Sequence, residues 1–318
     1  MNTAALTSFG RAFQGEIVLP GSADYDTARV VWNGMIDRRP AAIARCTNVD
    51  DVRDAILFAR DQDLPVAVRG GGHSVGGFST CDAGLVIDLS PLRGVEVDHE
   101  ARVAHVRGGS LLQQLDAAAQ EHGLVCPVGV VGHTGVGGLT LGGGMGRLQR
   151  HFGYSIDNMR AVELVTADGE LIRASEDEHP DLFWGMRGAG PNFGVVTSFE
   201  FRLHELGPIV TQGLLIFPPE RAHQVAARVR EWAPTAPDEV MTSFSFGQAT
   251  GAPPDPPDTT AAPWCTWVSP TRALPNPRTR TSARSAIWGR SSTRSSLGAT
   301  STSRRWRMRT WHGASAST

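Results

Sequence analysis

A run of glycines that includes one histidine is the stretch of this chain best suited to chemistry. It reads Arg69-Gly70-Gly71-Gly72-His73-Ser74, and Gly76 and Gly77 follow it closely. Backbone without side chains lets N–H groups approach an anion, and the imidazole among them offers a nucleophilic nitrogen. The stretch therefore predicts a loop that binds a phosphate-bearing cofactor, with His73 close enough to contact that cofactor or bond to it.

A second glycine-rich segment runs from Pro127 to Gly146, where nine of twenty residues are glycine and none carries a formal charge. Val, Leu and Thr alternate with these glycines, unlike in a flexible linker. The segment predicts either another wall of the same ligand site, with Thr134 and Thr140 as hydrogen-bond donors, or a buried crossing of chain segments without a ligand. Neither glycine segment contains G-x-G-x-x-G, so a Rossmann dinucleotide site is unsupported.

The elements that would position these segments are strands and helices with several antiparallel pairs, which predicts an α+β fold rather than a βαβ repeat. Apolar periodicity and turn residues indicate a helix capped by Asp50 and another capped by Ser110. The expected helices cover 51–61 and 111–121, and the expected strands and hairpins cover 41–46, 65–68, 85–89, 95–106, 162–174 and 195–203.

Charge is divided unevenly along the chain. All 32 acidic residues lie at or before Asp258, whereas the last 60 residues hold ten arginines and no acid. That stretch has few aliphatic residues other than alanine, so it cannot bury enough apolar area to offset its ordering entropy. We expect a disordered tail over 259–318, either a genuine arginine-rich segment that binds an acidic partner or nucleic acid, or, as we favour, the product of a shifted reading frame.

Several classes of function are excluded by composition. The chain contains no lysine, so it has neither a Walker-A phosphate loop nor a pyridoxal Schiff base. It contains no apolar run long enough to span a membrane. Its four cysteines lack metal-ligand spacing and indicate reduced thiols of a cytoplasmic protein without a metal site; they are Cys46, Cys81, Cys126 and Cys265.

Three motifs in the same order resemble the bacterial berberine-bridge-enzyme-like oxidoreductases, which share the vanillyl-alcohol-oxidase (PCMH) type of FAD-binding domain. The resemblance covers roughly residues 30 to 250, and three ordered motifs are a specific signal. The motifs are Val68–Ser74, Thr134–Gly144 and Phe183–Thr197.

The resemblance implies a two-subdomain PCMH-type FAD domain over 37–207, after a lead-in over 1–36. The start of an α/β substrate domain over 208–258 would be left incomplete before the tail. The implied reaction is oxidation of an alcohol, sugar or secondary-metabolite C–H bond by hydride transfer to flavin N5. Molecular oxygen or another molecule would accept the electrons, and no nucleic acid would be involved. The alternatives are a non-catalytic flavin-binding remnant and a nucleotide-sugar reductase, against which the histidine argues.

By the same resemblance, His73 matches the histidine that bonds to the flavin 8α-methyl carbon. Some relatives add a cysteinyl link, but Cys126 is displaced from that position, so we expect one link and a packed thiol. The family's tyrosine-bearing C-terminal segment is missing, because the chain has only Tyr25 and Tyr154. No catalytic base is assigned. The FAD contacts that the resemblance implies are Arg69, Gly70, Gly71, Gly72, His73, Ser74, Gly76, Gly77, Thr134, Gly135, Gly137, Gly138, Thr140, Gly142, Gly143, Gly144, Gly146 and Val196.

Overall fold

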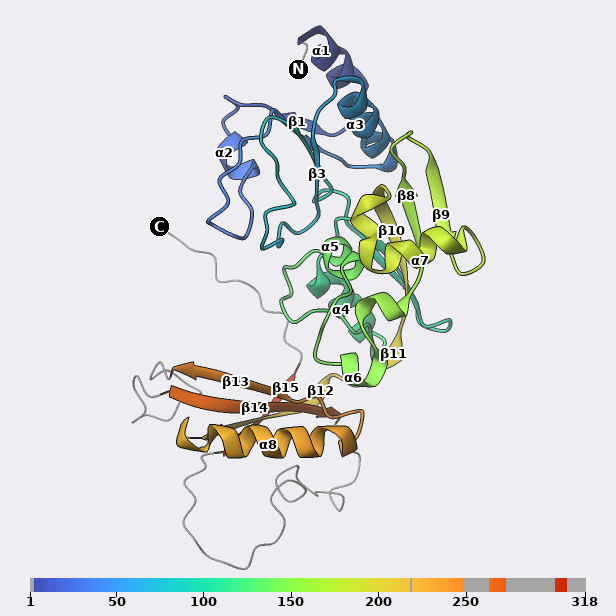
Figure 1. Cartoon of the computed structure of the whole chain (residues 1–318). Coiled ribbons are helices and arrows are strands. Elements are labelled where there is room, and N and C mark those ends of the chain that lie inside the picture. The colour runs from blue at the N-terminus through green and yellow to red at the C-terminus, as the bar shows by residue number, and fades with distance from the viewer. Residues whose placement is uncertain (1–2, 218, 249–262, 273–300, 308–318) are drawn as a thin grey trace, which may run out of the picture. The chain divides into compact units, whose positions relative to one another are not determined.

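The computed structural model describes residues 3–217, 219–248, 263–272 and 301–307, and the chain divides into two compact units between Leu206 and Gly207. The first unit mixes parallel and antiparallel sheets with helices, and the second places a helix along a sheet (Figure 1). The predicted α+β class is therefore confirmed. Among the described helices, none has the length and apolarity needed to cross a membrane.

The first sheet of unit 1 has the strand order β1-β2-β4-β3, in which β2 and β3 run parallel to β4 and β1 runs antiparallel to β2. The N-terminal lead-in is part of this layer, since Phe9 of helix α1 stacks on Phe58 of helix α3 with ring centroids 4.4 Å apart. The elements of this layer are α1 (Thr3–Ala12), β1 (Glu16–Val18), α2 (Tyr25–Ala28), β2 (Ala42–Arg45), α3 (Val49–Asp61), β3 (Val66–Arg69) and β4 (Leu85–Asp88).

The second sheet of unit 1 is antiparallel throughout, with the order β5-β6-β10-β8-β9. Its core includes Phe199 of β10 and residues from three helices, such as Leu115 and Phe183. The elements are β5 (Val95–Asp98), β6 (Val103–Arg107), α4 (Leu112–Gln120), β7 (Leu124–Val125), α5 (Val136–Leu141), α6 (Gln149–Phe152), η1 (Ser155–Asn158), β8 (Met159–Val165), β9 (Leu171–Ser175), α7 (Pro180–Ala189), η2 (Gly190–Asn192), β10 (Val195–Arg202) and β11 (His204–Glu205).

The two expected helix caps are wrong: Asn48 caps helix α3 in place of Asp50, and the N-cap position of helix α4 is Leu111, whose side chain cannot accept a hydrogen bond. Helix α3 begins two residues early, and Asn48 Oδ1 accepts the N–H of Asp51 at 2.9 Å. The Ser110 hydroxyl instead joins the β5–β6 hairpin, donating to the carbonyl of Gly94 and accepting its N–H. Short-range spacing shows where a cap can lie, but long-range partners decide which side chain is used.

Unit 2 contains a four-stranded sheet of order β13-β14-β12-β15, and helix α8 lies along one face of it (Figure 1). Two of its strands fall in the stretch expected to be disordered. β-Branched and aromatic residues favour extended backbone there, a tendency that a count of aliphatic residues misses. The other tail residues lie outside the described ones. The elements are β12 (Ile209–Phe217), η3 (Pro219–Arg221), α8 (Ala222–Trp232), η4 (Ala233–Thr235), β13 (Ser243–Gln248), β14 (Pro263–Arg272) and β15 (Ser301–Arg307).

Helix α4 carries an unpaired acid. No hydrogen bond or ion pair from the described residues reaches Asp116, and burial raises the pKa of its carboxyl to about 7. A carboxyl whose pKa is raised in the folded state stabilises at low pH and loses this contribution as pH rises through the raised value. At pH 8 we expect Asp116→Asn to raise the free energy of unfolding by about 1–3 kcal/mol, and at pH 5 to change it little.

Denaturant titrations at the two pH values measure this difference. Asp177→Asn, which changes an exposed acid of the same unit, is the matched control and should have little effect at either pH. Equal stability of Asp116→Asn and the unchanged protein at pH 8 would show that the carboxylate is adequately solvated.

Candidate functional site

The first glycine loop leaves the sheet at a buried ion pair. Strands β3 and β4 run in parallel and end at Arg69 and Asp88, whose Nη2 and Oδ2 atoms lie 2.6 Å apart with side chains 9% and 1% exposed. The Arg69 guanidinium also donates to the carbonyl of Ala28, and the Asp88 carboxylate accepts both the N–H and the hydroxyl of Ser90. Arg69 therefore anchors the start of the loop through contacts within the protein.

The two glycine segments touch each other backbone to backbone. A Cβ built on Gly71 would lie 2.2 Å from the nitrogen of Gly135, and one built on Gly135 would lie 2.3 Å from the nitrogen of Gly71. Any other residue at either position would force these chains apart, because both obstacles are backbone atoms. The close approach explains why glycine is needed at both positions, which are 64 residues apart in the chain.

Gly108, just after β6, joins all three motifs at one point. Its carbonyl oxygen lies 3.5 Å from a Cβ built on Gly70 and 3.2 Å from one built on Gly137. A Cβ on Gly108 itself would lie 2.4 Å from the carbonyl oxygen of Val196 in β10. Val196 is buried there and lies outside the pocket described below.

The loop presents a row of unused hydrogen-bond donors. In the described structure, none of the backbone N–H groups from Gly70 to Gly76 donates a hydrogen bond, whereas Gly77 donates to the carbonyl of Ser74. The N–H of Gly135, adjacent to Gly71, also has no acceptor among the described residues. Gly72 is buried, and Gly70, Gly71, His73 and Ser74 are half-buried, whereas Val75 and Gly76 are exposed. Because N–H groups shielded from water are nearly always paired in proteins, the cluster indicates a place for an anionic ligand.

The remaining glycines divide between two roles that the sequence leaves open. Gly144 and Gly146 mark close packing, since a Cβ on them would lie 2.3 Å from Ser155 Oγ and 1.9 Å from the carbonyl oxygen of Val128. A Cβ on Gly138 or Gly143 would meet nothing within 4 Å. The second segment is thus a tight crossing at some positions and open at others. Gly142 has only ordinary contacts, and Gly76 and Gly77 pack against Phe78 and Ile36.

His73 lies between two aromatic rings at the end of the loop. Its Nε2 atom lies 2.6 Å from Nδ1 of His133 in the second glycine segment. The ring of Trp32 stacks on the other side, with centroids 5.2 Å apart and an interplanar angle of 21°. Burial, and to a lesser degree the neighbouring His133, lower the pKa of His73. His73 is therefore neutral near pH 7, the form in which its nitrogen can act as a nucleophile.

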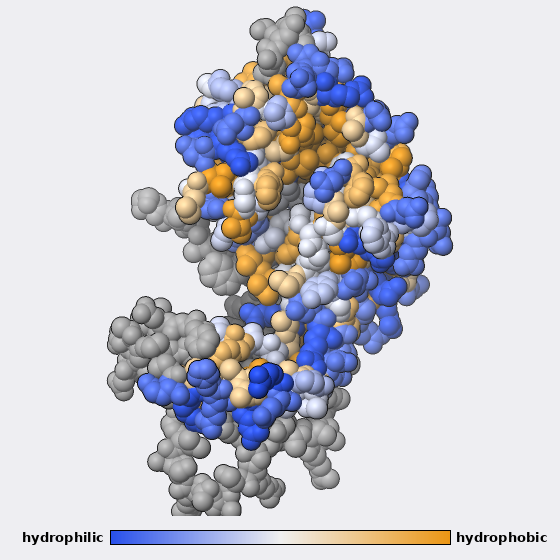
Figure 2. Space-filling view, viewed as in Figure 1, coloured by the Kyte–Doolittle hydropathy of each residue, from blue (hydrophilic) through white to orange (hydrophobic). Residues whose placement is uncertain are grey.

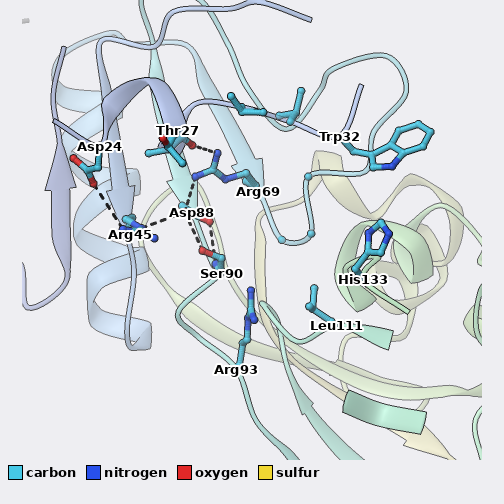
Figure 3. A pocket seen from close by; sticks show the side chains of 16 residues that line it. Asp24, Thr27, Trp32, Arg45, Arg69, Asp88, Ser90, Arg93, Leu111 and His133 are labelled. Carbon is cyan, nitrogen blue, oxygen red and sulfur yellow. Dashed lines mark hydrogen bonds and ion pairs between the residues drawn. The ribbon is translucent and has the colours of Figure 1, made fainter. Parts of the chain in front are cut away.

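A pocket of about 460 Å³ opens beside the loop (Figure 3). Arg69 and Asp88 lie on one side of it, and Trp32 and His133 lie on the other. Arg93 also lines it, and no acid among the described residues pairs with this exposed guanidinium. The pocket thus joins backbone donors, a free cation and an aromatic side chain, which suits a ligand with both phosphate and ring systems.

Hydrophobic side chains gather near the middle of the face of unit 1 drawn in Figure 2. Asn33 Nδ2 donates to the carbonyl of Val75 at 2.8 Å, so the segment before β2 is tied to the glycine loop. Several large apolar side chains of these two segments are mostly exposed, which is unusual at such density. They are Val30, Trp32, Met35, Val75 and Phe78.

Some expected site residues have other partners in the structure. The Ser74 hydroxyl accepts the N–H of Phe78 within the loop. The carbonyl of Thr134 accepts a hydrogen bond from the N–H of Leu112. The Thr140 hydroxyl is buried, with no hydrogen-bond partner in the described structure. Asp157 Oδ2 accepts the N–H of Tyr154 at 2.8 Å and so caps a turn.

Sequence reasoning missed the partners of the loop. His133 stands inside the uncharged glycine segment and could have been noticed as its one titratable group. Asp88 ends a buried strand, and an acid at the end of an apolar run is a usable signal. The role of Trp32 had no signal in the sequence, since it depends on a contact across 41 residues of chain. Cys126 is 1% exposed, as expected for a packed thiol, and burial raises its pKa.

Known proteins are similar to this chain in sequence and in fold. A family model described as an FAD binding domain matches residues 40–175. (R)-6-hydroxynicotine oxidase from Paenarthrobacter nicotinovorans is 38% identical over 208 residues, which are 65% of this chain and 45% of that protein. BBE-like 1 from Physcomitrella patens has a TM-score of 0.80 at 25% identity over 95% of this chain and 63% of its own. The chain resembles the berberine-bridge-enzyme-like FAD-linked oxidoreductases over most of its own length.

A further structural relative is glucooligosaccharide oxidase from Acremonium strictum, whose FAD is 6-S-cysteinyl, 8α-N1-histidyl. Its TM-score is 0.73 at 27% identity, and the match covers 83% of this chain and 55% of that one. The chain thus spans about half the length of the relatives that it matches.

The residues present fit FAD. A diphosphate needs several N–H donors in a space that no Cβ fills, and the loop from Gly70 to Gly76 with Gly135 provides them. Arg93 adds a positive charge to the same pocket. The chain therefore has a donor set suited to a diphosphate without the glycine fingerprint of a Rossmann fold.

Substitutions at two glycines test this geometry. Gly71→Ala places a methyl group against the backbone of Gly135, so we expect the free energy of unfolding to fall by about 1–3 kcal/mol and FAD binding to be lost. Gly34→Ala is the matched control, because its Cβ meets nothing within 4 Å and Gly34 is not among the expected FAD contacts. Denaturant titration and FAD fluorescence measure both effects. Equal stability of the two variants would contradict the close approach.

Proposed function

We propose that this chain binds FAD with a single covalent bond from His73 and that it serves to oxidise a C–H bond of a small molecule. The observation that carries the proposal is the row of unpaired N–H groups from Gly70 to Gly76, which includes the neutral His73. When bound, FAD supplies flavin N5 as the hydride acceptor for an alcohol, a sugar or a secondary metabolite. Molecular oxygen or another acceptor takes the electrons afterwards.

In this proposal the chain's own residues bind and orient the cofactor. The backbone from Gly70 to Gly76 and Gly135 donates to the diphosphate, and Arg93 offsets its charge. Trp32 holds the plane of the His73 ring, so that the ring presents one edge to the flavin. Exposed apolar side chains beside the loop suit contact with a flat ring system.

The boundaries of the FAD domain, 37–207, and of the incomplete substrate domain, 208–258, are part of the proposal. The free thiols of Cys46, Cys81 and Cys126 support a reducing, cytoplasmic location. Reading the encoding DNA in all three frames near codon 250 tests whether the tail arises from a shifted frame, as we favour.

A second candidate is a flavin-binding remnant without turnover, and it is favoured by the half-length match to the relatives. Both candidates require bound flavin, so only a test of substrate oxidation distinguishes the enzyme from the remnant. Reduction of the bound flavin by an alcohol or sugar, seen as bleaching of its visible absorbance under anaerobic conditions, supports the enzyme. Bound flavin that no such substrate bleaches supports the remnant.

His73→Ala tests the covalent bond. We expect the unchanged protein to keep its flavin after acid precipitation and the peptide that contains His73 to carry the mass of one flavin. The variant should release all of its flavin, because the proposal assigns the single covalent bond to His73. His105→Ala, which changes an exposed histidine on β6, is the control and should retain the flavin. Acid-stable flavin in His73→Ala would assign the bond to another residue.

A further inference from the structure

His73 and His133 form a hydrogen bond between their rings, which the attachment of a flavin to His73 does not by itself require. The rings come from segments 60 residues apart, and the Nε2 and Nδ1 atoms that face each other are separated by 2.6 Å. At this distance one nitrogen must carry the proton and the other must accept it. In the described part of the chain, no other side chain forms a hydrogen bond with the His73 ring.

The direction of this hydrogen bond decides which nitrogen of His73 can react. If Nε2 holds the proton and donates it to His133, then Nδ1 of His73 keeps a free lone pair. Trp32 stacks on the ring face, so the ring cannot readily turn over to exchange its two nitrogens. In this tautomer Nδ1 of His73 is the nucleophile and Nε2 is the proton donor to His133.

Forming a bond from a neutral imidazole to carbon makes the ring cationic unless the other nitrogen loses its proton. A base within hydrogen-bond reach removes that barrier. Resting on the proposed covalent flavin, we propose that His133 is the base: it accepts the Nε2 proton of His73 while Nδ1 bonds to the 8α carbon of the flavin. His133 is exposed and can pass the proton to water.

The step balances when the flavin itself takes the electrons. One C–H bond of the 8α-methyl group breaks and one N–C bond forms, and the electron pair reduces the ring system by two electrons. Two protons leave, one from the methyl group and one from His73 through His133. Dioxygen then reoxidises the ring and takes up two electrons and two protons as hydrogen peroxide.

Attachment kinetics test the proposal on the full chain. Protein made in flavin-starved cells is mixed with FAD in air, and acid-stable flavin is measured against time. We expect His133→Ala to attach flavin about 100-fold more slowly, because general base catalysis contributes at least that much. It should still bind FAD noncovalently within about threefold of the unchanged protein, and added imidazole should restore the rate. His122→Ala, an exposed histidine stacked on His99, is the control and should attach at the normal rate.

A second variant separates proton transfer from positioning. His133→Asn keeps an oxygen that can accept the hydrogen bond but cannot take the proton, so it too should attach slowly and respond to imidazole. Attachment at the normal rate by either variant overturns the role of His133 and leaves the covalent flavin in place. If the unchanged protein attaches no flavin, the proposed covalent function fails instead, and this inference fails with it.

Discussion

The backbone contact between Gly71 and Gly135 is the constraint on which the site depends. Two chain segments can come this close only where neither carries a side chain. The contact sets the distance between the loop after β3 and the segment before α5, and so it places His73 beside His133. It also leaves the N–H groups of the loop without acceptors, because the chain that approaches them presents its own N–H group. The contact between Gly71 and Gly135 therefore determines both the position of His73 and the set of free N–H donors.

The loop keeps this position because its base is fixed. The ion pair between Arg69 and Asp88 is almost completely buried, and a buried pair of this kind stabilises one arrangement rather than adding much net stability. Gly108 provides a second point of fixation, where its carbonyl group approaches Gly70 of the first segment and Gly137 of the second. All of these contacts lie in unit 1, so the geometry of the donor row is set within one compact unit. The relatives add about as much chain again, and it is there that we expect the substrate to be selected.

Most of the fold and the location of the glycine-rich site could be predicted from the sequence. Apolar periodicity located most strands and helices, and the order of three glycine-rich motifs indicated the family. The partner of His73 could not be predicted, since it depends on a contact across 60 residues. Composition could not show which glycines mark tight packing, as at Gly146, and which leave space, as at Gly138. The cap expected at Asp50 was wrong because helix α3 starts earlier and Asn48 takes that role, and the cap expected at Ser110 was wrong because the distant backbone of Gly94 binds its hydroxyl.

Amide hydrogen exchange of the loop, measured with and without FAD, tests the central claim most directly. The N–H groups from Gly70 to Gly76 have no acceptor in the described structure, so they should exchange quickly in the free protein. The account predicts that FAD slows exchange across this stretch and at Gly135, with little change in the β5–β6 hairpin. Unchanged exchange from Gly70 to Gly76 in protein that has bound FAD would contradict the account.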